Sequence, residues 1–173
     1  DWIEGTRALV PGGFNTAPAP YGTLYQYPQG DTSAPPTGQM PPGGFYFDAI
    51  IRQAPIDDAR LDPRENLEEF RPISDEAVAY LSAEAARLDK TEYAIVGSLA
   101  ATALGDTGLV GALLLKHPRG IRSAEEWYIS LLTRKDYVHA VFQGIVENGI
   151  RNLAQCAAAI GDKMQIVALS GAD

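Results

Sequence analysis

Hydrophobic and polar positions along residues 91–173 predict a strand, a set of helices and a second strand. Residues 93–99 (YAIVGSL) and 164–169 (MQIVAL) are short apolar runs rich in β-branched residues, a composition typical of strands. Both runs are apolar at nearly every position, as expected for parallel strands covered on both faces. A long helix-patterned stretch separates them, and parallel neighbours need a crossover of this kind. The pattern therefore predicts a parallel βαβ unit.

Two helices are expected inside this crossover. Ser123 with Glu126 has the spacing of a capping box that opens a helix through about Leu132, and Thr133 with Asp136 resembles a weaker box that opens the next one. The apolar positions of that long helix recur every three or four residues, at Val138, Phe142, Ile145, Gly149, Leu153, Cys156 and Ile160. Gly161 follows where a helix commonly ends.

Further helices are predicted upstream of the first strand. Asp62 followed by Pro63 marks the start of a short helix that reaches about Phe70. Ser74 is the expected N-cap of a helix that runs to about Leu88, with one apolar stripe at Val78, Leu81, Ala85 and Leu88. Downstream of that strand, inside the crossover, a short helix is also expected over residues 109–115.

Residues 1–51 are rich in Gly, Pro and aromatic residues and predict a small antiparallel sheet. Strands are expected at residues 6–10, 22–27 and 45–51. Residues 34–44 form a Pro- and Gly-rich loop that no helix could cross. The sequence thus divides into a hairpin region, residues 1–51, and a region of β/α units, residues 52–173.

Composition and charge exclude several classes of protein. Hydrophobic residues make up 46% of the 173 residues and charged residues 21%, which is typical of a folded globular chain. The net charge of −8 leaves no basic field for a phosphate backbone, so nucleic acid is not an expected partner. No apolar run reaches the length of a membrane span, and the first residues do not resemble a signal peptide. We therefore expect a soluble cytoplasmic protein with no membrane partner.

The single cysteine and the two histidines predict no metal site. Cys156 lies on the apolar side of the long helix, where an inert buried thiol is expected, and it has no second cysteine for an intrachain disulfide. His117 and His139 have no Cys or His partner at metal-binding spacing and are expected to be exposed or packed side chains. We therefore expect no metal ligands within this chain.

Candidate catalytic residues follow the two predicted parallel strands, because ligands of such sheets bind beyond the carboxyl ends of the strands. Asp173 is the first candidate, with Ser170 beside it as a substrate-binding residue. Asp106 is the second, with Thr102 and Thr107 expected to contact substrate. Capping of a following helix is the favoured alternative for Asp106, since Asp commonly occupies that position.

The aromatic residues of the hairpin region have two possible roles. Phe47 is a candidate substrate-binding residue, since aromatic side chains in such loops can form the floor of a pocket for a flat ligand. Alternating aromatic residues in a hairpin more often cover a core, and this second role is favoured.

Residues 25–36 (YQYPQGDTSAPP) and 40–48 (MPPGGFYFD) resemble a segment of the uroporphyrinogen decarboxylase superfamily, in the branch that includes corrinoid-dependent methyltransferases. The resemblance continues through YAIVG at 93–97, HPRGIR at 117–122 and LSGAD at 169–173. It implies an α/β fold: a partial (β/α)₈ barrel with an N-terminal antiparallel hairpin insertion. It also implies that the chain is one portion of such a barrel.

The resemblance implies one of two reactions on a tetrapyrrole or other small-molecule substrate. Decarboxylases of the family carry an Arg-Gln-Ala-Gly-Arg motif for the substrate's propionates, and Arg52-Gln53-Ala54 echoes only its beginning. The absence of the complete arginine motif favours corrinoid-dependent methyl transfer. The partner would be a corrinoid (cobalamin) protein, and zinc would be bound outside these residues. Decarboxylation in tetrapyrrole biosynthesis is the alternative. A non-catalytic binding module is a further one, because an open parallel strand at the end of a sheet tends to pair with something else.

Overall fold

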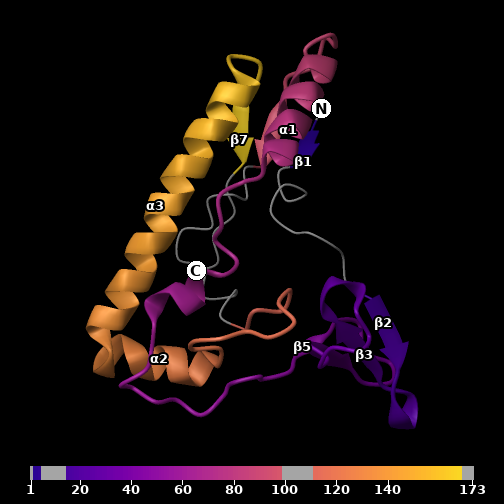
Figure 1. Ribbon diagram of the computed structural model, residues 1–173. Coiled ribbons are helices and arrows are strands. Elements are labelled where there is room, and N and C mark those ends of the chain that lie inside the picture. Colours follow the sequence, from indigo (N-terminus) through magenta and orange to yellow (C-terminus); the bar gives the residue numbers. More distant parts are fainter. Residues whose placement is uncertain (1, 5–14, 99–110, 169–173) are drawn as a thin grey trace. The chain divides into compact units, whose positions relative to one another are not determined.

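The structure is a computed structural model that describes residues 2–4, 15–98 and 111–168 (Figure 1). Contacts within the chain group it into two compact units. The first contains residues 1–10, 70–106 and 142–173, and the second contains residues 11–69 and 107–141. Each unit is thus built from segments far apart in the sequence, and the boundary expected at residue 51 stays a prediction.

A three-stranded parallel sheet forms part of the first unit. Its strands are β1 (Trp2–Glu4), β6 (Val96–Ser98) and β7 (Ile166–Ala168), in the order β1-β6-β7. Val96 pairs with Ile166 and Ser98 pairs with Ala168 across β6 and β7. The parallel pairing predicted for these two segments is therefore confirmed, although both strands are shorter than the apolar runs that predicted them.

Two helices accompany this sheet. Helix α1 (Asp75–Leu88) has Ser74 as its N-cap, whose hydroxyl accepts a hydrogen bond from the Ala77 N–H at 3.2 Å. Helix α3 (Lys135–Ile160) begins in the second unit and continues into the first. Gly161 follows α3 with a φ of 64°, the left-handed conformation expected of a residue that ends a helix. The sequence predicted both helices and this terminator.

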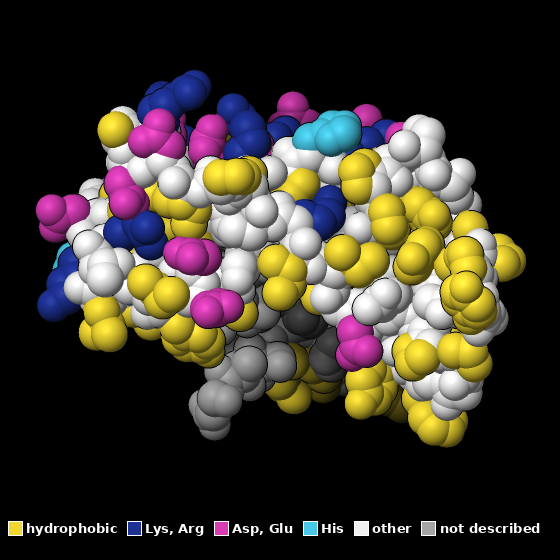
Figure 2. All heavy atoms as spheres, turned by 90° about the horizontal axis from the view of Figure 1, so that it is seen from below, with side chains coloured by type: hydrophobic (Ala, Val, Ile, Leu, Met, Phe, Trp, Pro, Cys, Tyr) yellow, Lys and Arg dark blue, Asp and Glu magenta, His cyan; other side chains and the backbone are white. Residues whose placement is uncertain are grey.

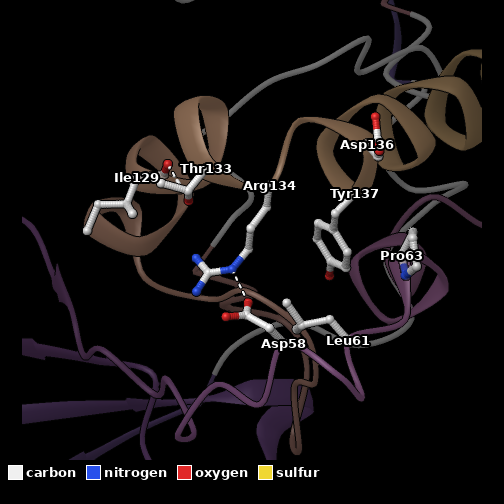
Figure 3. Close-up of a pocket in the computed structure, with 8 residues that line it drawn as sticks. All are labelled: Asp58, Leu61, Pro63, Ile129, Thr133, Arg134, Asp136 and Tyr137. Atoms are coloured by element: carbon white, nitrogen blue, oxygen red, sulfur yellow. Dashed lines mark hydrogen bonds and ion pairs between the residues drawn. The ribbon is translucent and has the colours of Figure 1, made fainter.

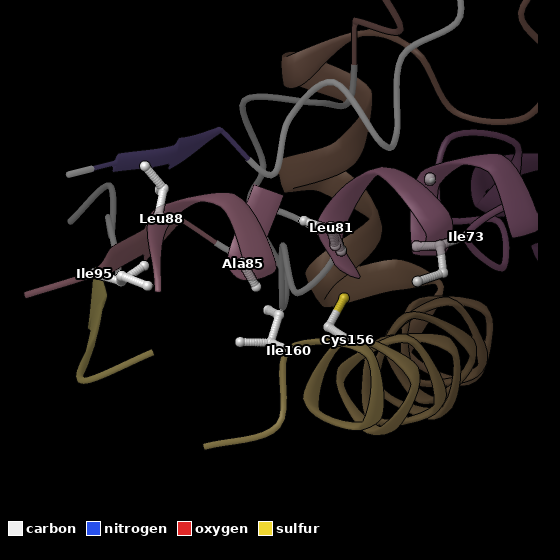
Figure 4. Packing of buried hydrophobic residues seen from close by; sticks show 8 residues of the cluster. Ile73, Leu81, Ala85, Leu88, Ile95, Cys156 and Ile160 are labelled. Atoms are coloured by element: carbon white, nitrogen blue, oxygen red, sulfur yellow. The ribbon is translucent and has the colours of Figure 1, made fainter. Parts of the chain in front are cut away.

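The core of the first unit joins α1 to the C-terminal half of α3 (Figure 4). Leu81 and Ala85 of α1 lie against Cys156 and Ile160 of α3, and Ile95 closes the cluster just before β6. The predicted apolar stripes of both helices are the faces that pack here. Burial raises the pKa of the Cys156 thiol, in agreement with the predicted inert, buried cysteine.

One buried amide fixes α3 to the segment that precedes α1. The Asn152 side chain, 2% exposed, accepts a hydrogen bond from the Ile73 N–H at 3.1 Å and donates one to the Arg71 carbonyl at 3.0 Å. Asn148, one turn earlier on α3, donates to the Phe70 carbonyl at 2.8 Å. These bonds satisfy backbone groups of a segment that has no regular secondary structure.

A four-stranded antiparallel sheet forms part of the second unit. Its strands, in order across the sheet, are β2 (Asn15–Pro18), β3 (Leu24–Tyr27), β4 (Gly38–Met40) and β5 (Asp48–Ala49). The antiparallel sheet expected for this region is present, although its first strand is β2. The strand predicted at residues 6–10 lies outside the described residues.

Two short 3₁₀ turns of the same type flank β3. Pro20–Gly22 joins β2 to β3, and Pro28–Gly30 follows β3. In each, the residue after proline and the glycine both have a positive φ, which is 61° at Tyr21 and 76° at Gly22. This geometry matches the tight turns that join twisted antiparallel strands. The side chain of Tyr21 is 98% exposed at the tip of the hairpin.

The helical part of the second unit differs in detail from the predictions. Residues 63–67 form a 3₁₀ helix, η4 (Pro63–Leu67), rather than an α-helix to Phe70, although Asp62 does cap it. Residues 111–115 form turns rather than the predicted helix. Helix α2 (Ala124–Thr133) is present, but the Ser123 side chain makes no capping hydrogen bond, and the Thr133 hydroxyl donates back to the Ile129 carbonyl.

The expected partial (β/α)₈ barrel is wrong. The described residues contain one parallel sheet of three strands and a separate antiparallel sheet of four, with helices α1, α2 and α3. A barrel requires parallel strands that each lead into a helix. Within the described chain, the predicted β/α region supplies only β6 and β7 to the parallel sheet, and the third strand, β1, comes from the predicted hairpin region.

No helix in the described part of the chain is long and apolar enough to span a membrane. On the face shown in Figure 2, Lys and Arg side chains are interspersed with Asp and Glu side chains, and hydrophobic side chains also reach the surface. The most exposed large hydrophobic residues of the described chain are Tyr21, Phe45, Leu132, Tyr46, Tyr93 and Ile51.

We predict that Leu81→Ala lowers the free energy of unfolding by about 2–5 kcal/mol, because it leaves a cavity at a side chain that is 1% exposed. Leu132→Ala is the matched control. Leu132 is 77% exposed, and its loss should change stability by no more than about 0.5 kcal/mol. Urea denaturation of both variants measures the difference. Equal destabilisation by the two changes would contradict the assigned core.

Candidate functional site

The carboxyl ends of β6 and β7 are neighbours, because the register pairs Ser98 with Ala168. The predicted catalytic residues Asp106 and Asp173 follow these two strand ends in the sequence. Five of the six predicted site residues lie outside the described residues: Thr102, Asp106, Thr107, Ser170 and Asp173. Their roles stay predictions. The structure does establish that the strands leading to them are adjacent and parallel.

Phe47, the sixth predicted site residue, precedes β5 and is half-buried. A Cβ placed on Gly38 of β4 would lie 3.3 Å from the Phe47 Cβ, so Phe47 packs closely over the sheet at Gly38. Its predicted role as a substrate-binding residue stays a prediction. Phe45 and Tyr46 are 96% and 75% exposed, so they do not form the floor of an enclosed pocket.

Arg52 forms a hydrogen-bonded centre that the sequence did not predict. Its Nη1 donates to the Leu115 carbonyl at 2.7 Å, and its Nη2 donates to the Ala112 carbonyl at 2.6 Å. Longer bonds reach the carbonyls of Lys116 and Gly111. Burial lowers the pKa of this guanidinium. Arg52 therefore acts here as a clamp on backbone oxygens.

A charged pair links the antiparallel sheet to residues 111–116, the segment whose carbonyls Arg52 binds. Lys116 Nζ lies 2.7 Å from the Asp31 Oδ2, and Gln29 donates to the Leu114 carbonyl at 3.3 Å. The hydrogen bonds from Lys116 and Ser33 hold the pKa of the Asp31 carboxyl well below its usual range. Asp31 therefore remains charged at neutral pH and serves as a structural anchor.

Arg122 is the most deeply buried charge among the described residues. Its side chain is 2% exposed and pairs with Glu69, which is 9% exposed, at 3.1 Å. It also donates to the backbone carbonyls of Glu65 and Arg119, each at 2.6 Å. Burial raises the pKa of Glu69, and Arg122 opposes this shift. These bonds link residues 65–69 to residues 119–122.

Asn66 binds both backbone polar groups of Ile121. It donates to the Ile121 carbonyl at 2.7 Å and accepts from the Ile121 N–H at 2.8 Å, while the Tyr137 hydroxyl donates to its Oδ1 at 2.6 Å. Burial is the main reason that the pKa of Tyr137 is raised to about 12. Gly120 has a φ of 84°, and a Cβ there would lie 2.4 Å from the Asn66 Oδ1, so glycine is required.

A pocket of about 730 Å³ opens beside Arg134, at the junction of α2 and α3 (Figure 3). It is lined by Asp58, Leu61, Pro63, Ile129, Thr133, Arg134, Asp136 and Tyr137. In Figure 3 the guanidinium of Arg134 points to the carboxylate of Asp58, and the Tyr137 ring lies between Arg134 and Pro63. Sequence reasoning missed this pocket, because its residues carry no motif and come from two segments, 58–63 and 129–137, that are far apart in the sequence.

No group of three or more His, Cys, Asp or Glu side chains is arranged to hold a metal ion within residues 2–4, 15–98 and 111–168. His117 and His139 are exposed, as the sequence predicted. The zinc that the family resemblance implies is expected outside these residues, so that expectation stays a prediction.

Replacement of Arg122 should be strongly destabilising, since it leaves the Glu69 charge buried without a partner. We predict that Arg122→Met lowers the free energy of unfolding by about 3–5 kcal/mol. The matched control is Arg64→Met. Arg64 pairs with Asp62 but its side chain is 86% exposed, so no measurable loss is expected. Thermal and urea unfolding compare the variants. An Arg122→Met protein with an unchanged free energy of unfolding would contradict the role assigned to the buried Arg122–Glu69 pair.

No protein-family model, curated protein or solved structure matches this chain.

Proposed function

We propose that this chain acts in methyl transfer, as part of a cytoplasmic enzyme that resembles the uroporphyrinogen decarboxylase superfamily in sequence but does not share its barrel fold. The methyl group would be delivered by a separate corrinoid protein, and the acceptor would be a small molecule such as a thiol. The sequence resemblance in residues 25–48 and 93–173 supports the family, and the adjacent ends of β6 and β7 support the location of the reaction.

The observation that carries methyl transfer over decarboxylation is the position of Arg52. This residue is the one echo of the family's propionate-binding arginine motif. Its guanidinium is occupied by four backbone carbonyls in residues 111–116, at 2.6–3.5 Å. A guanidinium committed to these oxygens is not free to form a bidentate pair with a substrate carboxylate. A decarboxylase of this family would need arginines for that purpose.

In the proposed reaction, Asp173 would accept the proton of the acceptor thiol and so make its sulfur nucleophilic. The corrinoid protein would supply the methyl group, and the products would be a methyl thioether, the demethylated corrinoid and a protonated carboxyl group. Asp106 orients the acceptor. Because the described residues offer no zinc ligands, no step is assigned to a metal.

A non-catalytic binding module is the second candidate, favoured by a specific feature of β7. This strand lies at the edge of the sheet, and the side chains of Ile166 and Val167 are each 50% exposed. Exposed apolar edge strands tend to pair with another chain. A chain that binds a partner through β7, without catalysing a reaction, would explain why these apolar side chains are exposed.

The test is to incubate the protein with methylcobalamin and a thiol and to follow loss of the methylcobalamin spectrum and formation of the thioether. We predict that Asp173→Asn slows the reaction by about 10²–10⁴-fold, the usual contribution of a general base. Asp162→Asn is the matched control, because Asp162 is exposed in the turn before β7 and should leave the rate unchanged.

A parallel assay offers uroporphyrinogen and measures released carbon dioxide. Decarboxylation without methyl transfer would overturn the proposal in favour of the tetrapyrrole reaction. Absence of both reactions, together with self-association that Val167→Lys abolishes, would establish the binding module instead.

A further inference from the structure

The Arg134 pocket has no role in the proposed reaction, and it consists entirely of residues from the second unit. Three of its lining residues are apolar: Leu61, Pro63 and Ile129. Arg134 is the one cation among its lining residues. The pocket therefore combines an apolar wall with a guanidinium, which is the composition of a site for an amphipathic anion.

Arg134 is held firmly by α2. Its side chain is 18% exposed, and its Nη1 donates to the Ser130 hydroxyl at 3.1 Å and lies 3.4 Å from the Glu126 carboxylate. Its Nε points the other way and donates to the Asp58 carboxylate (Figure 3). The guanidinium is thus positioned without Asp58, and its Nε side faces the pocket.

Asp58 is the most exposed of the partners of Arg134. Its side chain is 69% exposed, and it belongs to a segment without regular secondary structure between β5 and η4. The hydrogen bond from Arg134 is the main reason that the pKa of Asp58 is lowered. An exposed carboxylate in an ion pair contributes little net stability, because water solvates it nearly as well when it is released. Asp58 can therefore be displaced at low cost.

We propose that this pocket binds a small aliphatic carboxylic acid, whose carboxylate replaces Asp58 on the Nε of Arg134. The aliphatic part lies against Leu61, Pro63 and the ring of Tyr137. The exchange substitutes one carboxylate for another, so no net charge is buried. The hydroxyl of Tyr137 is already bonded to Asn66, which leaves the ring as a contact surface.

The other acidic residue of the lining does not alter the choice of an anion. The Asp136 carboxylate points away from Arg134 in Figure 3. Glu126 pairs with the far side of the guanidinium, at Nη1. An organic cation would have to bind beside Arg134 itself, and an alcohol or amide would form a weaker hydrogen bond with it than a carboxylate does.

The test titrates butyrate into the protein and measures affinity by calorimetry, with butyramide and butylammonium as ligands of matched size. We expect binding of butyrate alone. Asp58→Ala should strengthen butyrate binding about fivefold, because it removes the competing intramolecular carboxylate. Arg134→Gln should weaken butyrate binding at least about tenfold. Asp162→Ala removes an equal charge at an exposed turn and should leave the affinity unchanged.

Each alternative result decides against the site. Butyrate affinity that is unchanged or weaker in Asp58→Ala would show that Asp58 does not occupy the ligand position. Butylammonium or butyramide binding as tightly as butyrate would exclude recognition by Arg134. If Arg134→Gln fails to fold, as judged by circular dichroism, Asp58→Ala and the three ligands still decide the question.

Discussion

Parallel pairing of β6 with β7 is the constraint on which the functional account depends. Two strands of three residues each, joined by backbone hydrogen bonds, align the ends of segments that are 70 residues apart in the sequence. The pairing is supported just before the strands, where the N–H groups of Gln165 and Ile166 both donate to the Ile95 carbonyl at 3.2 Å. Because Ile95 also belongs to the core between α1 and α3, apolar packing and strand register are fixed together.

The two units are stabilised in different ways. The first is organised by an apolar cluster between two helices, the usual basis of a small folded unit. In the second, the segments with little regular structure are fastened by side chains that bond to backbone groups. Arg52 and Asn66 each make two or more such bonds across more than 50 residues of sequence. Arg122 makes one such long-range bond, to the Glu65 carbonyl, and one local bond to the Arg119 carbonyl.

Local patterns in the sequence predicted the elements near the parallel strands well. The apolar spacing of α1 and α3, the Ser74 cap and Gly161 are signals that depend on neighbouring residues, and each was confirmed. The barrel, which was inferred from the family resemblance and not from these local patterns, was wrong: the described strands form a three-stranded parallel sheet and a separate antiparallel sheet. The clamps at Arg52 and Arg122 were missed, since a buried arginine and an exposed one look alike in sequence. Of the predicted site, Phe47 alone lies within the described residues, so the sequence located the strand ends without establishing the chemistry there.

The central claim is that the residues that follow β6 and β7 serve a single reaction. A double-mutant cycle on the rate of methyl transfer tests it most directly, with Asp106→Asn, Asp173→Asn and the combined variant. Residues that act as a unit give strongly non-additive effects, so the combined variant should be about as slow as the slower single variant. Effects on the logarithm of the rate that simply add would show that the two carboxylates act at separate places, and would contradict the account.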